Sequence, residues 1–149
     1  MLLGTLLHPE LLAALGRSGH GAKILLADGN YPHSTGAPER AARVWLNLAP
    51  GILSVSDVLS VLLEAIVVEH AAVMAPEPDA LPEHRPEAIP AHDDYRAALS
   101  GGPFDELPRY EFYAAATAAD VDILIATGDQ RLYANILLTI GTRPLLNLT

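Results

Sequence analysis

Short apolar runs alternate along this chain with segments that have helical spacing, and this alternation constrains the fold more than any other feature. The run Lys23–Ala27 is too short for a helix and lies between glycines, so it predicts a buried strand. From Ser56 to Ile66, in contrast, the apolar residues recur every three or four positions, and Ser56-Asp57 is typical of a helix start. Strands that alternate with helices favour a layered α/β fold.

The other predicted elements continue the alternation. With 149 residues, close to the ~150 typical of one domain, the chain is expected to form a single domain over 1–149. Residues 76–90 carry five prolines and are expected to form a surface excursion that is not regular over its whole length. Further helices are predicted at 9–15, 93–99 and 110–119, and further strands at 44–48, 67–75, 121–127 and 133–140.

Charge and composition exclude several classes of partner. The net charge of −9 repels nucleic acid and anionic membrane surfaces, so neither is expected to bind. No apolar run approaches the ~20 residues of a membrane span, and no signal-peptide pattern is present. The absence of cysteine fits a cytoplasmic location, which is the expected one.

A histidine between two glycines, His20, is the first candidate for catalysis. Glycine reaches backbone conformations closed to other residues, so Gly19 and Gly21 allow the chain to aim the imidazole at a cavity. Asp28 follows an apolar strand, at the edge where open α/β sheets place their ligands. The plainer interpretations are a surface histidine and an aspartate that caps the next turn. We expect this block to hold a small polyol or sugar and to move protons on it.

A second candidate group lies near the end of the chain, where Tyr133, Ala134 and Asn135 open the last apolar run. On a strand, Tyr133 and Asn135 would project to the same side and present a phenol beside an amide. That pair suits the hydroxyl groups and the face of a sugar ring. Arg109, just before a predicted helix, either donates to a ligand oxygen or pairs with a neighbouring glutamate.

The sequence argues against the other common kinds of site. The histidines do not recur at the i, i+4 spacing of a helical zinc site and the chain has no cysteine, so we expect no metal. It also lacks the Gly-x-Ser-x-Gly elbow of serine hydrolases and the glycine-lysine signature of phosphate loops. We therefore expect chemistry that needs no cofactor.

Three groups of residues stand out together along the chain: Gly19-His20-Gly21 with Asp28 and Pro32; Arg109 leading into Phe112-Tyr113; and Thr127-Gly128 followed by Tyr133-Ala134-Asn135-Ile136-Leu137-Leu138. In order and spacing, over nearly the whole chain, they resemble the RbsD/FucU family, the ribose pyranases and fucose mutarotases. The resemblance implies a three-layer α/β/α sandwich, no cofactor, and interconversion of the anomers or ring forms of a free monosaccharide.

Carried over by position, the resemblance also implies roles for single residues. His20 is the proton donor, Asp28 and Arg109 contact the substrate, and Tyr133 to Asn135 complete the sugar site. Arginine at position 109 is similar to the fucose type, whereas the tail from Tyr133 looks more like the ribose branch. We expect L-fucose as the substrate, with D-ribose as the alternative. A non-catalytic monosaccharide-binding accessory protein, in which His20 is dispensable, is the alternative from another class.

The length of the predicted strand raises a geometric problem for a site built from one chain. At ~3.3 Å per residue, His20 and Asp28 lie up to ~25 Å apart at opposite ends of a straight strand. Either the glycine turn folds back over the sheet, or the two residues come from different copies of the chain. The second option agrees with the ring-shaped homo-oligomers, such as a decamer, that the resemblance implies.

Overall fold

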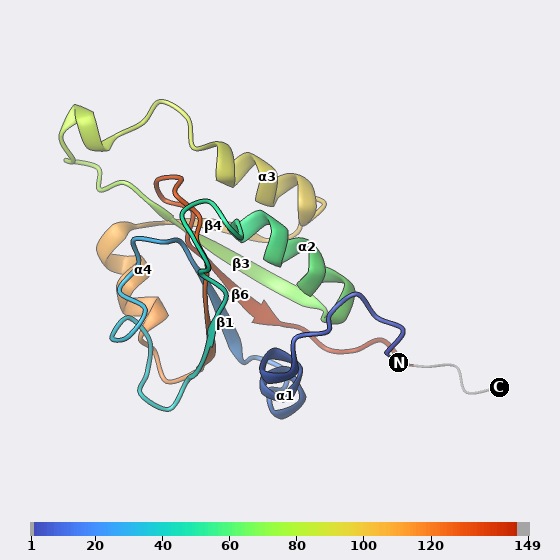
Figure 1. Ribbon diagram of the computed structural model, residues 1–149. Helices are drawn as coiled ribbons and strands as arrows, with labels where there is room; N and C mark the ends of the chain where they lie inside the picture. The colour runs from blue at the N-terminus through green and yellow to red at the C-terminus, as the bar shows by residue number, and fades with distance from the viewer. Residues whose placement is uncertain (1, 146–149) are drawn as a thin grey trace.

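The computed structural model describes residues 2–145 and is built around one six-stranded mixed sheet (Figure 1). Its strands are β1 (Lys23–Ala27), β2 (Ala42–Trp45), β3 (Val68–Ala75), β4 (Phe104–Pro108), β5 (Val121–Ala126) and β6 (Ile136–Ile140). Their order across the sheet is β2-β5-β1-β6-β3-β4. Strands from both ends of the chain therefore lie side by side at the centre.

Helices cover both faces of this sheet, which confirms the predicted three-layer α/β/α sandwich (Figure 1). Three of them share a core with one face, and the fourth packs on the other face with the loop that follows β1. The first three are α1 (Pro9–Arg17), α2 (Val55–Ala65) and α3 (Pro90–Ala98), and the fourth is α4 (Arg109–Ala116).

The central strand β1 shows why both faces are covered. Ile24 and Leu26 pack into the core below α1, α2 and α3, whereas Leu25 and Ala27 pack into the core below α4. Successive side chains on a strand point to opposite faces, so a run that is apolar at every position must be buried on both sides. All four side chains are fully buried.

The strand directions bring one set of loops to a single edge of the sheet. β6 runs antiparallel to β1 and β3, while β5 runs parallel to β1 and β2, and β4 runs parallel to β3. The carboxyl ends of five strands therefore meet the beginning of β6 at one edge. Asp28, Arg109 and the segment 133–135 all lie there, because each directly follows or precedes one of these strand ends.

The structure adds one strand that was not predicted and corrects two local predictions. β4 was not expected, because this edge strand contains Asp105 and Glu106 and has no run of apolar residues. The last strand begins at Ile136 rather than at Tyr133, which has a left-handed φ of 58°. The N-cap of α2 is Ser54 rather than Ser56. The Ser54 side chain accepts from the backbone N–H of Asp57, the third helical residue, and the Asp57 side chain accepts from the backbone N–H of Ser54.

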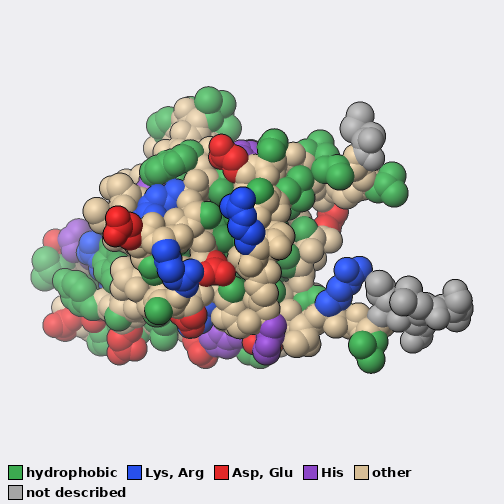
Figure 2. All heavy atoms as spheres, turned by 90° about the horizontal axis from the view of Figure 1, so that it is seen from below, with side chains coloured by type: hydrophobic (Ala, Val, Ile, Leu, Met, Phe, Trp, Pro, Cys, Tyr) green, Lys and Arg blue, Asp and Glu red, His purple; other side chains and the backbone are tan. Residues whose placement is uncertain are grey.

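The proline-rich excursion contains one short 3-10 turn, η1 (Pro82–His84), and extends beyond the edge of the sheet between β3 and α3 (Figure 1). On the face seen in Figure 2, basic, acidic and apolar side chains are interspersed. Within residues 2–145, no helix has both the length and the apolar character needed to cross a membrane.

Candidate functional site

Asp28 lies at the loop-bearing edge of the sheet, the edge where the carboxyl ends of five strands meet the beginning of β6. There it forms a reciprocal pair of hydrogen bonds with Asn135. The Asp28 N–H donates to Asn135 Oδ1 over 2.8 Å, and Asn135 Nδ2 donates to Asp28 Oδ2 over 2.9 Å. The other carboxylate oxygen accepts from the N–H of Asn30. Asp28 is only 5% exposed, and its burial raises the pKa of the carboxyl despite the opposing effect of the Asn30 hydrogen bond.

A cavity of about 220 Å³ opens beside this carboxyl. It is lined by Asp28, Arg109, Tyr133 and Asn135, four of the six residues predicted for the site. They come from three separate parts of the chain, after β1, after β4 and before β6. The sheet therefore brings together residues that lie more than one hundred positions apart in the sequence.

Cationic and aromatic groups form the outer part of the cavity. The Arg109 guanidinium lies over the Tyr113 ring, 5.6 Å from its centroid, and both residues line the cavity. The Tyr133 hydroxyl donates to the carbonyl of His84 over 2.8 Å, which ties the proline-rich excursion to this wall. The cavity thus offers a guanidinium, a buried carboxyl and aromatic rings, which are the groups that bind hydroxyls and the apolar face of a sugar.

Five further residues that line the cavity were not predicted as site residues from the sequence. They are Asn30, Met74, His84, Tyr113 and Leu132. The signal for Tyr113 was its position four residues after Arg109, which places both side chains on one face of a helix. His84 carried no such signal, because only the tertiary contact with Tyr133 brings η1 to this edge.

The other two predicted residues do not line the cavity. His20 lies at the opposite edge of the sheet, where its Nε2 is 3.0 Å from Glu69 Oε2 and the next residue, Gly21, bonds the carbonyl of Ile140. The glycine turn therefore does not fold back over the sheet, although Gly21 uses a left-handed φ of 81° as expected for glycine. Ala134 is fully buried, and its carbonyl accepts from the Tyr95 hydroxyl.

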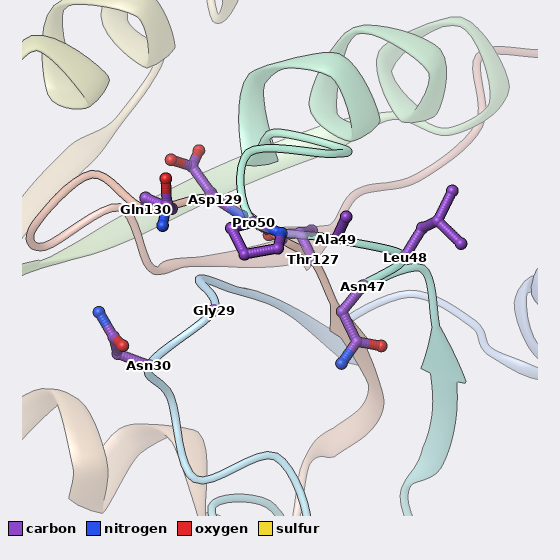
Figure 3. A pocket seen from close by; sticks show the side chains of 10 residues that line it. Gly29, Asn30, Asn47, Leu48, Ala49, Pro50, Thr127, Asp129 and Gln130 are labelled. Carbon is purple, nitrogen blue, oxygen red and sulfur yellow. Dashed lines mark hydrogen bonds between the residues drawn. The ribbon is translucent and has the colours of Figure 1, made fainter.

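A larger cleft of about 400 Å³ lies on the other side of Asn30, above the ends of β1, β2 and β5 (Figure 3). Its acidic residue, Asp129, points out of the cleft toward the first turn of α2 (Figure 3), where it accepts from the N–H of Val55 over 2.9 Å. Burial alone would raise the pKa of Asp129, but hydrogen bonds from Arg131 and Val55 outweigh it and lower the pKa. That carboxylate is committed to structure, so acid-base chemistry is better supported in the Asp28 cavity.

The chain is similar in sequence to proteins of one known family. Residues 1–143 match the model of the RbsD / FucU transport protein family. The chain is 34% identical to the fucose mutarotase of Bos taurus over 144 residues, which cover 91% of this chain and 89% of that one. It is also 34% identical to the D-ribose pyranase of Variovorax paradoxus over 138 residues, covering 91% and 94%.

A solved structure matches as well. The structure of Bacillus subtilis RbsD in complex with D-ribose superposes with a TM-score of 0.79 and 25% identity, covering 97% of this chain and all of that one. Sequence and structure therefore agree over almost the full length. The chain belongs to the RbsD/FucU family.

Proposed function

We propose that this protein is a sugar mutarotase, an isomerase that interconverts the anomers of a free monosaccharide by opening and closing its ring. The observation that carries the proposal is the cavity at the loop-bearing edge, where a buried carboxyl with a raised pKa faces the same space as Arg109 and two tyrosines. Family membership and the names of the relatives support the same reaction class.

The chemistry requires two proton transfers. The proton of the anomeric hydroxyl is removed and the ring oxygen is protonated, so the bond between the anomeric carbon and the ring oxygen breaks and an open-chain aldehyde forms. Rotation about the carbon–carbon bond next to the aldehyde, followed by closure on the other face, reverses both transfers. In our proposal Asp28 holds the anomeric hydroxyl and its ionised carboxylate accepts that proton, while His20 donates a proton to the ring oxygen. Arg109 holds other sugar hydroxyls, Tyr133 packs on the ring and Asn135 fixes Asp28.

The position of His20 makes a second copy of the chain part of the proposal. Five residues of β1 separate the two edges by roughly 16 Å, which is too far for one small sugar to span. We infer that the His20 of a neighbouring copy completes the cavity around Asp28, within a closed ring of identical subunits. His20 suits this role because its side chain is 58% exposed and approachable by another molecule. The cytoplasmic location remains a prediction from composition.

The relatives support two sugars. L-fucose is the first candidate, since arginine at position 109 resembles the fucose type and the similarity to the bovine fucose mutarotase covers most of both chains. D-ribose is the second candidate, because the D-ribose pyranase of Variovorax paradoxus is equally identical in sequence.

Saturation-transfer NMR on the anomeric protons tests the proposal. We expect the protein to accelerate exchange between the α and β forms of L-fucose above the spontaneous rate, and to act less on D-ribose and least on D-glucose. The His20→Ala variant should return the rate to that of buffer alone. If the wild-type protein broadens sugar resonances through binding but leaves the exchange rate spontaneous, the accessory-protein alternative is correct and the enzyme proposal is wrong.

A further inference from the structure

Two side chains of α3 reach across to the segment that carries Tyr133 and Asn135. His92 Nε2 donates to the carbonyl of Tyr133 over 3.0 Å, and the Tyr95 hydroxyl donates to the carbonyl of Ala134 over 2.7 Å. Both side chains are buried, with exposed fractions of 3% for His92 and 0% for Tyr95. Burial lowers the pKa of His92, which keeps the imidazole neutral and leaves it a neutral donor to this carbonyl.

The segment needs external support because its own backbone is irregular. Tyr133 has a φ of 58°, a left-handed backbone conformation that residues other than glycine rarely adopt. Regular pairing of β6 with its neighbours begins only at Ile136. Such conformations persist only where the surroundings fix them, and the two bonds from α3 act on consecutive carbonyls of this turn.

The same segment determines the position of the buried carboxyl. The side-chain amide of Asn135 accepts from the Asp28 N–H through Oδ1 and donates to Asp28 Oδ2 through Nδ2. A shift of the segment therefore moves the Asn135 amide relative to Asp28, and it moves the Tyr133 ring at the cavity wall as well.

We propose that Tyr95 and His92 are positioning residues of the sugar site, which hold the Tyr133–Asn135 turn so that Asn135 orients the Asp28 carboxylate and Tyr133 forms the cavity wall. Neither residue lines the cavity, so both act through the turn rather than on the sugar. This inference rests on the proposed mutarotase function. It adds α3 to the elements that build the site.

The Tyr95→Phe variant tests the inference with the smallest change, because it removes one hydroxyl and keeps the ring. We expect kcat and kcat/KM for anomer exchange to fall about 10-fold or more, because a shifted turn misplaces the groups that hold the reacting sugar. The matched control is Tyr110→Phe, which removes a hydroxyl from a tyrosine that is 70% exposed, and it should keep the wild-type rate. Circular dichroism should show both variants folded at the assay temperature.

A double-mutant cycle separates positioning from general destabilisation. If Tyr95 acts through the turn, Tyr95→Phe should have little further effect on kcat once Asn135→Ala has already released Asp28. Rescue gives a second readout, because His92→Gln keeps an N–H donor and should retain more activity than His92→Leu.

Each outcome of these measurements decides the inference. Additive effects in the cycle, or a Tyr95→Phe variant with wild-type kcat, would overturn the positioning role and leave the mutarotase function standing. A wild-type protein that does not accelerate exchange with any sugar would overturn the function and the positioning role together.

Discussion

The Asp28→Asn variant is expected to lose about 10²–10⁴-fold in kcat/KM for anomer exchange, the range typical of a positioned proton-transfer group. The substitution keeps the size of the side chain but removes its charge. Both carboxylate oxygens of Asp28 accept hydrogen bonds, from the Asn30 N–H and from Asn135 Nδ2. An asparagine must turn its amino group toward one of these donors, so the arrangement cannot be kept.

The control for this variant is Asp79→Asn, which makes the same change in net charge at an exposed position of the proline-rich excursion. It should exchange anomers at the wild-type rate. Wild-type activity in Asp28→Asn would remove Asp28 from the proposed site. Loss of activity in both variants would point to an effect of net charge rather than to the cavity.

The direction of the Asp28 pKa shift also has a consequence for pH. A raised pKa means that the folded chain holds this proton more tightly than the unfolded chain does. Asp28 therefore favours folding in acid and opposes it as the pH rises from the ordinary aspartate pKa of about 3.9 through the folded-state value. Activity that depends on the ionised carboxylate should appear over a higher pH range than an ordinary aspartate would give.

The second large effect is expected on stability, in the Arg131→Ala variant. Arg131 Nη2 lies 2.7 Å from Asp129 Oδ2, and Nη1 lies 2.7 Å from Asp94 Oδ2 on α3. Asp129 is 2% exposed, so removal of the Arg131 side chain leaves a buried carboxylate that accepts only from the backbone N–H groups of Val55 and residue 131. We expect the free energy of unfolding in urea to fall by about 2 kcal/mol at pH 7, less than the ~3–5 kcal/mol for breaking a fully buried ion pair, because the Arg131 side chain is 31% exposed.

A matched pair at the surface gives the control. Arg40 pairs with Asp122 where more than half of the arginine side chain is exposed, and Arg40→Ala should change the free energy of unfolding by less than about 1 kcal/mol.

The pair of Arg131 with Asp129 should also depend on pH. The Asp129 pKa is lowered, so the contribution of this carboxylate to stability is present above the ordinary aspartate pKa and is lost as the pH falls through the folded-state value. The difference between wild type and Arg131→Ala should therefore shrink in acid, and a difference that stays constant down to low pH would contradict this assignment.

The fold could be predicted from the sequence to the extent that periodicity and burial agree. The run from Ile24 to Ala27 in β1 is apolar at every position and lies at the centre of the sheet, so its pattern indicated a strand covered on both faces. Edge strand β4 carried no comparable signal, because half-exposed residues need not be apolar. Tertiary pairing with β3 determines β4, and no local pattern reports that pairing.

The candidate site was predictable in its parts but not in its assembly. Asp28 and Arg109 were identified by their places after a strand and before a helix, and both line the cavity. The prediction that Tyr133 and Asn135 project to the same side of one strand was wrong, because Tyr133 precedes the strand in a left-handed conformation. The two residues still meet at one cavity, and the contacts that hold them there come from α3 and η1, far away in the sequence.

The most direct test of a sugar site shared between subunits is complementation between two inactive variants. His20→Ala and Asp28→Asn are co-expressed with different tags, and mixed assemblies are purified through both tags and assayed for anomer exchange. If His20 and Asp28 of one site come from neighbouring copies, random mixing restores both groups at about one site in four, so about a quarter of the wild-type rate should return. Mixed assemblies no more active than the separate variants would show that both residues act within a single chain.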